Sequence, residues 1–209
     1  MAAEVAHEVK SPLTAVKGAA GLLERLADNP GREKVKQYRQ IVTEEIDRVE
    51  NMLSNLQDLA KPLSIDKERL DINSLIRKTI QLASVGDLDL TLSFSCGEDI
   101  PEVEADPSLL KQVILNIIRN ASDACGKDGR LEIKTLSDHE SVRMEFTDNG
   151  PGISREIRSR IFEPFFTTKE SGLGLGLLVS SRIVVAHGGR IVLDNVRSGG
   201  ARVTVVIPR

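Results

Sequence analysis

The sequence predicts two domains: an all-α antiparallel helical hairpin, paired into a dimeric four-helix bundle, followed by an α+β sandwich. Three features support this prediction. Residues 1–60 carry apolar positions at helical spacing and no alternating strand pattern. A polar stretch that contains Pro62 then interrupts the chain at 60–74. Beyond it, alternating apolar segments are interleaved with helical ones, as in a sheet layered against helices.

The composition narrows the class of protein. The chain has 209 residues, 40% of them apolar, which is enough for a hydrophobic core. A net charge of −3, 3% aromatic residues and no Trp argue against a nucleic-acid binder. Cys96 and Cys125 form no disulfide framework, so a reducing, cytoplasmic setting is expected. No apolar run is long enough to span a bilayer, so we expect membrane attachment only through a region upstream of residue 1.

The first domain is predicted over residues 1–62. An apolar stripe at spacings of four and three predicts the first helix, a turn follows at 28–32, and apolar residues seven apart predict the second helix. One hairpin has too small a core to be stable alone, so two copies are expected to pair as a homodimer. The first stripe is Val9, Leu13, Val16, Ala20, Leu23 and Ala27; the second includes Val35, Val42, Val49, Leu56 and Leu63.

A linker at 63–72 is predicted to lead into the second domain, residues 73–209. Its first helix should cover 73–84, with Asp71 or Asn73 as the N-cap. Further helices are expected at 107–125, 154–161 and 173–187. Alternating residues predict strands at 88–95, 102–105, 130–137, 141–148, 189–195 and 201–207.

Two motifs of the second domain have both a chemical and a plain structural interpretation. Asn116 and Asn120 share a helix face at i, i+4, and their amide oxygens suit a Mg²⁺-bound phosphate, although two surface asparagines are equally expected. In "DNGPGIS", Asp148 can accept a hydrogen bond from an exocyclic amine. Gly150 and Gly152 would admit a flat ligand, but the segment also reads as an ordinary turn.

Two further motifs follow along the chain. "IFEPFFTTKESG" at 161–172 combines a hydrophobic plug with a short polar segment that suits a mobile lid over a ligand. "GLGLGL" at 172–177 places glycines before an apolar helix, where free backbone N–H groups attract phosphate. Its spacing matches neither a P-loop nor a dinucleotide fingerprint.

Taken in order, the motifs resemble those of the histidine protein kinases of bacterial two-component signalling. "HEVKSPL" resembles the phosphoacceptor box, the Asn116/Asn120 helix the N box, and "DNGPGI" the G1 box. "FEPFFTTK" resembles the F box and "GLGLGL" the G2 box. The resemblance implies a dimerisation and histidine-phosphotransfer domain, then an ATP-binding domain of the Hsp90, gyrase B and MutL type. The style of the boxes is closest to that of nitrogen-regulator and sporulation kinases.

The resemblance also implies residue roles. His7 would attack the γ-phosphate of ATP and then pass the phosphoryl group to an aspartate of a response regulator, with Glu8 as the general base. Asn120 would bind Mg²⁺, and Asp148 would bind the adenine amine. The remaining ATP-binding positions it implies are Asn116, Asp123, Gly150, Gly152, Ile153, Phe162, Phe166, Thr167, Thr168, Lys169, Gly172, Leu173, Gly174, Leu175, Gly176 and Leu177.

Two positions depart from the family pattern. Ser11 stands where relatives usually carry threonine or asparagine, which places a response-regulator phosphatase activity in question. Asp123 stands where many relatives carry lysine. Lys169 could offset phosphate charge or be a solvated side chain. Two alternatives stay open: a scaffold that only senses ATP, and an ATPase or serine kinase of the same superfamily, which would lack the hairpin that carries His7.

Pro12 lies five residues after His7, inside the first predicted helix. Proline removes the hydrogen bond to residue 8 and crowds its carbonyl, so a bend is predicted there.

Overall fold

The computed structural model describes residues 2–25, 33–43, 45, 46, 49, 63–84, 90–169, 174–197 and 199–209. The chain divides into two compact units. One comprises Met1–Lys61 with Phe165–Leu175, and the other comprises Pro62–Pro164 with Gly176–Arg209. Within the described residues, no helix is long and apolar enough to cross a membrane.

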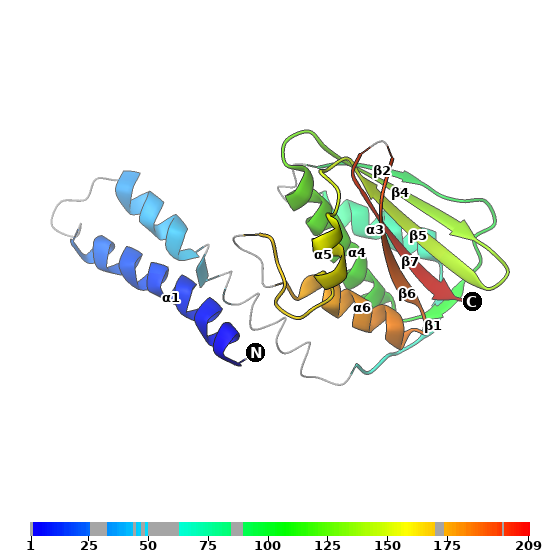
Figure 1. Ribbon diagram of the computed structural model, residues 1–209, viewed down its shortest axis with the longest axis horizontal. Coiled ribbons are helices and arrows are strands. Elements are labelled where there is room, and N and C mark those ends of the chain that lie inside the picture. The colour runs from blue at the N-terminus through cyan, green and yellow to red at the C-terminus, as the bar shows by residue number, and fades with distance from the viewer. Residues whose placement is uncertain are drawn as a thin grey trace. The chain divides into compact units, whose positions relative to one another are not determined.

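The described residues of the N-terminal part of the first unit are helical, as predicted. Helix α1 runs over Ala2–Arg25, and residues 33–43 form a second helical segment (Figure 1). Pro12 lies inside α1, where the helix continues on both sides of it. The predicted turn at 28–32 and the greater part of the second predicted helix fall outside the described residues.

The second unit contains two sheets. Strand β1 (Glu68–Leu70) pairs antiparallel with β3 (Val103–Ala105). The larger sheet has the strand order β2-β4-β5-β7-β6, in which β2 and β4 are parallel and the other neighbours antiparallel. Its strands are β2 (Leu90–Ser95), β4 (Gly129–Ser137), β5 (Ser141–Asp148), β6 (Arg190–Asn195) and β7 (Ala201–Pro208).

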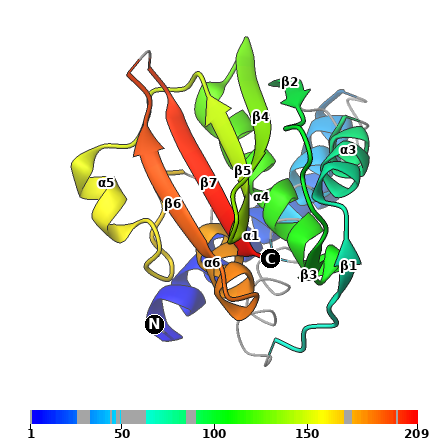
Figure 2. The ribbon, with the colours of Figure 1, turned by 90° about the vertical axis from the view of Figure 1, so that its right-hand side faces the viewer.

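Three helices cover one face of this sheet (Figure 2). They are α3 (Ile72–Ala83), α4 (Pro107–Cys125) and α6 (Gly176–Ala186), while the short α5 (Arg155–Arg160) follows β5. Burial alternates along β4 and β5, so every second side chain points toward the helices. The core is formed by these strand residues and the apolar face of α4, including Ile133, Met144, Phe146, Ile114, Ile117 and Ile118.

The helix bounds follow from local chemistry. Asp71 caps α3 by accepting the Ser74 N–H, which confirms one of the two predicted caps. Asp106 caps α4 in the same way, with Pro107 at the first helical position. Helix α6 begins later than the predicted 173, because Gly174 has φ +65° and a left-handed residue cannot continue a right-handed helix.

One strand lies where the sequence predicts a linker. Residues 63–72 were expected to be a polar connection, but β1 lies within them and pairs with β3. The Asp66 N–H also donates to Asp106 Oδ2 at 3.1 Å. Part of the predicted linker therefore belongs to the sheet-containing unit.

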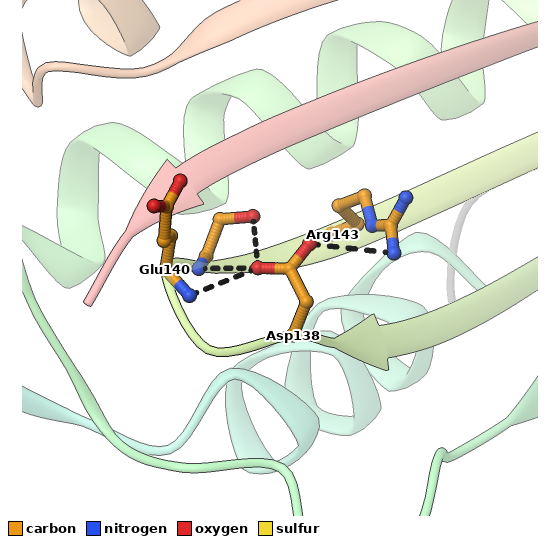
Figure 3. A network of polar contacts seen from close by, with 4 residues as sticks. Asp138, Glu140 and Arg143 are labelled. Atoms are coloured by element: carbon orange, nitrogen blue, oxygen red, sulfur yellow. Dashed lines mark hydrogen bonds and ion pairs between the residues drawn. The ribbon is translucent and has the colours of Figure 1, made fainter.

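The turn between β4 and β5 is held by Asp138 (Figure 3). Its Oδ1 accepts hydrogen bonds from the N–H groups of Glu140 and Ser141, at 3.0 and 2.8 Å, and from the Ser141 hydroxyl. Its Oδ2 lies 3.5 Å from Arg143 Nη2. These backbone and hydroxyl donors, then Arg143, lower the pKa of Asp138. The turn held by the Asp138 carboxylate sets the register of β5 against β4, and β5 ends at Asp148.

A buried polar cluster joins α6 to the start of α4. The His187 ring is 1% exposed; its Nε2 accepts the Asp106 N–H at 2.9 Å, and its Nδ1 donates to the Ile183 carbonyl. Burial opposes ionisation of Asp106. The N–H groups of Leu109, Asp66 and Ser108, together with His187, nevertheless hold the pKa of that carboxyl below its usual value.

Candidate functional site

Asp148, the last residue of β5, is oriented by two backbone groups. Its Oδ1 accepts the Gly150 N–H at 2.9 Å and the Ala201 N–H at 3.0 Å. Its Oδ2 has no hydrogen-bond partner among the described residues, and the side chain is half-buried. One oxygen therefore anchors the carboxylate while the other can accept a hydrogen bond from a ligand.

Gly200 allows this close approach of β7 to β5. A Cβ at Gly200 would lie 1.9 Å from the Asp148 carbonyl oxygen, and its φ is +88°. No L side chain fits there, because both the backbone angle and the contact exclude it. The glycine thus brings the Ala201 N–H into reach of Asp148.

The loop after Asp148 is held from both sides by asparagines. Asn195, at the end of β6, accepts the Ile153 N–H at 2.8 Å and donates to the Ile153 carbonyl at 2.7 Å. On the other side, Asn149 Oδ1 accepts the Arg130 N–H at 2.7 Å. Gly152 has φ +78°, and its Cβ would lie 3.0 Å from Asn195 Oδ1. These contacts hold the backbone of the loop in one conformation.

Asn116 on α4 is tied to the start of α6. Its Nδ2 donates to the Ser180 hydroxyl at 2.8 Å, and Ser180 is 1% exposed. A Cβ at Gly176 would lie 2.4 Å from Asn116 Oδ1, so a larger residue there would displace the Asn116 side chain from its place between the two helices. Leu177 follows in α6, half-buried. Asn116 therefore positions the first turn of α6.

Asn120 lies one turn after Asn116 on the same face of α4 and is half-buried. Its amide oxygen is a hard donor of the kind that Mg²⁺ prefers. No cluster of three or more His, Cys, Asp or Glu side chains that could hold a metal occurs in the described part of the chain. Asp123 is exposed on the same helix.

Cys125 closes α4 beside this loop. A Cβ at Gly150 would lie 3.4 Å from its Sγ. Burial, then the negative charge of Asp148, raises the pKa of the Cys125 thiol. The thiol is accordingly neutral at physiological pH and adds an apolar wall next to the carboxylate.

The second unit thus places predicted residues in two clusters. Asp148, Gly150, Gly152 and Ile153 lie in and around the loop, and Asn116, Gly176 and Leu177 lie at the α4–α6 contact. Phe162 lies half-buried in the turn after α5. Asn195, Ser180, Gly200 and Ala201 support these residues, and sequence reasoning missed them. Asn195 lies at the end of a strand and Ser180 lies in a helix. The sequence around each residue does not indicate its hydrogen-bond partner, which is distant along the chain.

The predicted lid residues belong to the other unit. Phe166, Thr167 and Lys169 are half-buried and Thr168 is exposed, and the Lys169 N–H donates to the Thr167 hydroxyl at 3.1 Å. A Cβ at Gly174 would lie 2.3 Å from the Phe166 carbonyl oxygen, so the two ends of the segment meet. Leu175 is buried. Gly172 and Leu173 lie outside the described residues.

His7, Glu8 and Ser11 lie in α1. The structure describes the backbone at these positions and not the side chains, so the roles implied for them stay predictions. Thr14 and Gly18, one and two turns further along the helix, are exposed.

Two family models match the chain in order. Residues 1–65 match the His Kinase A (phospho-acceptor) domain, and residues 105–209 match the histidine kinase-, DNA gyrase B-, and HSP90-like ATPase family. The second match covers the α4 asparagines, Asp148 and the "GLGLGL" motif that leads into α6.

Similar proteins match the chain over both of these regions. Sensor histidine kinase ZraS of Escherichia coli O157:H7 is 37% identical over 210 residues, which cover 100% of this chain and 45% of ZraS. Sporulation kinase E of Bacillus subtilis is 33% identical, over 100% of this chain and 28% of its own length. The chain thus spans less than half the length of these relatives.

Solved structures agree with the fold. Histidine kinase ThkA, crystallised in complex with response regulator protein TrrA, is 30% identical, with a TM-score of 0.84 over 100% of this chain and 60% of ThkA. The separate ThkA catalytic domain is 33% identical, with a TM-score of 0.62, and the match covers 68% of this chain and 95% of that domain. From its matched domains and its relatives, the chain belongs to the sensor histidine kinases of two-component systems.

Proposed function

We propose that this chain is the catalytic core of an ATP-dependent protein-histidine kinase, which phosphorylates itself on His7 and passes the phosphoryl group to an aspartate of a response regulator. The observation that carries the proposal is the Asp148 carboxylate. The N–H groups of Gly150 and Ala201 anchor its Oδ1, and its Oδ2 would accept a hydrogen bond from the exocyclic amine of adenine. The family match supports ATP as the nucleotide.

The nucleotide contacts that we propose follow from this orientation. Gly150 and Gly152 would lie against the adenine ring, since neither carries a side chain and the Asn195 clamp holds their loop. Asn120 would bind Mg²⁺ through its amide oxygen, while Asn116 aligns the start of α6 near the phosphates. Bound Mg²⁺ would neutralise phosphate charge during transfer. Lys169 and the backbone around Gly174 and Gly176 would contact the phosphates.

The proposed reaction is an in-line displacement. The neutral His7 imidazole is a competent nucleophile near pH 7. Its nitrogen forms a bond to the γ-phosphorus, and the bond from that phosphorus to the β–γ bridging oxygen breaks to release ADP. Glu8 accepts the proton from the other ring nitrogen, so the ring does not retain an extra positive charge. A carboxylate oxygen of the regulator's aspartate later forms a bond to the phosphorus as the N–P bond breaks, and Glu8 returns its proton so that the His7 ring is neutral again.

We propose a homodimer through the helical hairpin. Leu13 and Leu22 of α1 are 51% and 40% exposed, and Ile46 is 43% exposed. Apolar side chains at these levels of exposure on a small helical unit favour pairing with a second copy. Sedimentation equilibrium should therefore give twice the chain mass, and Leu13→Glu should shift it toward the monomer.

A response regulator is the proposed phosphoryl acceptor. The structural relative ThkA was crystallised with the response regulator TrrA. The exposed positions Thr14 and Gly18 leave room for a docked protein beside α1. We propose action in the cytoplasm, where ATP is available, and fractionation of cells with an antibody against the chain would test it.

Incubation with γ-labelled ATP and Mg²⁺ tests the kinase. We expect label that is stable to alkali, lost in acid and absent from His7→Gln. Acid-stable label would point to a serine kinase, and ATP binding without label would point to a scaffold. Movement of the label from the phosphorylated chain to a purified receiver domain tests the proposed phosphotransfer. Phosphate release from the phosphorylated receiver, compared between wild type and Ser11→Ala, tests the proposed phosphatase activity.

A further inference from the structure

The face of the large sheet that the helices leave open carries a groove lined by arginines. The groove has a volume of about 570 Å³ and extends over β5, β7, β6 and the loop after β6. Arg143, Arg190, Arg197 and Arg202 line it, with Glu145 and Asp194 as its acidic residues. This volume lies within the range of ligand-binding clefts.

Strand register places these side chains in rows. Arg143 on β5 and Arg190 on β6 both pair with Val206 of β7, so they flank it. Neighbouring strands lie about 4.8 Å apart, which separates the two arginine Cα atoms by roughly 10 Å. The next row has Thr204 between Glu145 and Val192, and the row after it has Arg202 between Thr147 and Asp194.

The acids near the groove are already engaged. Asp138 lies 3.5 Å from Arg143, Glu145 lies 3.7 Å from Arg202, and Asp194 pairs with Arg158 of α5. Arg190 and Arg197 have no ion-pair partner in the part of the chain that the structure describes. The four arginines that line the groove and Arg158 carry five positive charges, and the three acids carry three negative ones. The region therefore has an excess of two positive charges, in a chain whose net charge is −3.

One donor of an arginine that lines the groove is buried without a partner in the described part of the chain. Arg143 Nε has almost no solvent access and no hydrogen-bond acceptor, although Nη2 of the same guanidinium faces Asp138. A buried N–H without an acceptor costs free energy. The exposed part of this guanidinium can still bind a carboxylate, because the planar fork of arginine binds carboxylates in a bidentate manner.

The apolar floor of the groove favours an anionic ligand that also has an aliphatic part. Val192, Val196 and Val206 lie between the arginines, and Val192 is 38% exposed. An aliphatic side chain would bury the exposed Val192, whereas inorganic phosphate would not. None of the described residues that line the groove is aromatic, so they offer no platform on which a nucleic-acid base could stack. We propose that this arginine groove is a docking surface for an acidic, extended polypeptide segment in which carboxylates flank an aliphatic residue.

A phage-displayed library of random dodecapeptides, selected on the intact immobilised chain, tests this proposal. We expect enrichment of peptides with acidic residues on both sides of an aliphatic one. The affinity of the best peptide, measured by fluorescence anisotropy, should fall at least tenfold in Arg190→Glu/Arg197→Glu. It should stay unchanged in Lys111→Glu, which reverses a charge on the exposed side of α4.

Autophosphorylation by the double variant should equal that of the wild type, since neither arginine belongs to the proposed nucleotide site. That result separates failure of the groove from failure of the kinase. Three results would overturn the proposal: no enrichment of acidic peptides, equal affinity of the double variant, or displacement of the peptide by inorganic polyphosphate at equal charge concentration.

Discussion

Replacement of Asn195 by alanine removes the clamp on the loop after Asp148. The Asn195 amide makes two hydrogen bonds to the backbone of Ile153, at 2.8 and 2.7 Å, and touches no other part of the loop by a polar contact. The truncation leaves β6 and its pairing with β7 intact, because strand pairing uses backbone groups. The loop would then sample more conformations than the one that suits a flat ligand.

The size of the effect follows from the two lost bonds. Each contributes about 0.5–1.5 kcal/mol net, and the lower half applies because water can reach Ile153. Together the two bonds favour the binding-competent loop by about 1–2 kcal/mol, so their loss weakens ATP binding by about fivefold to thirtyfold. Asn195→Asp keeps the acceptor and loses the donor, so its effect should be intermediate.

Isothermal titration with a non-hydrolysable ATP analogue measures this change. Asn73→Ala is the matched control, since it removes one side-chain hydrogen bond of 2.7 Å, to Thr135, away from the loop. That variant should lose thermal stability with unchanged nucleotide affinity. Equal affinity of Asn195→Ala and the wild type would refute the view that the clamp prepares the nucleotide site.

Three further predictions concern other parts of the fold. Gly176→Ala should cost about 1–3 kcal/mol of stability and weaken ATP binding, because its Cβ would lie 2.4 Å from Asn116 Oδ1. Gly21→Ala is the control, because no atom lies within 4 Å of a Cβ there, and its thermal denaturation should show no loss of stability. The pKa of Asp106 is lowered in the fold, so its ionised form stabilises the protein above the ordinary value of 3.8, and this stabilisation is lost as the pH falls below it. Urea unfolding of Asp106→Ala should therefore show a deficit of about 2 kcal/mol at pH 7 that shrinks below pH 4; a constant deficit would contradict this. Pro12→Ala should leave ATP binding intact and change the ratio of autophosphorylation to transfer rates, and unchanged rates would reduce Pro12 to a structural role.

The helices and strands of the second domain were largely predictable, because their signals are local. The start of α4 is set by Asp106 and Pro107, and the alternation of β4 and β5 reports their burial on one face. Strand β1 was missed because three residues, Glu68–Leu70, are too short to show alternation. Its position depends on pairing with β3, more than thirty residues away.

The chemical residues of the site were easier to predict than their supports. Asp148, Asn116 and the glycines stand in recognisable motifs. Asn195 contacts a residue 42 positions away and Ser180 one 64 positions away, and no spacing rule connects such pairs. The anchoring of Asp148 through Ala201 likewise depends on the β5–β7 contact, which only the folded sheet creates.

The position of the phosphoryl group after reaction with ATP tests the central claim most directly. The intact chain would be incubated with ATP and Mg²⁺, digested at alkaline pH and mapped by mass spectrometry. We predict phosphate on His7 of the wild type and none on Asp148→Asn, whose amide cannot offer the same acceptor and charge to adenine. Phosphate on Ser11 or another residue in place of His7, or equal phosphorylation of Asp148→Asn, would contradict the account.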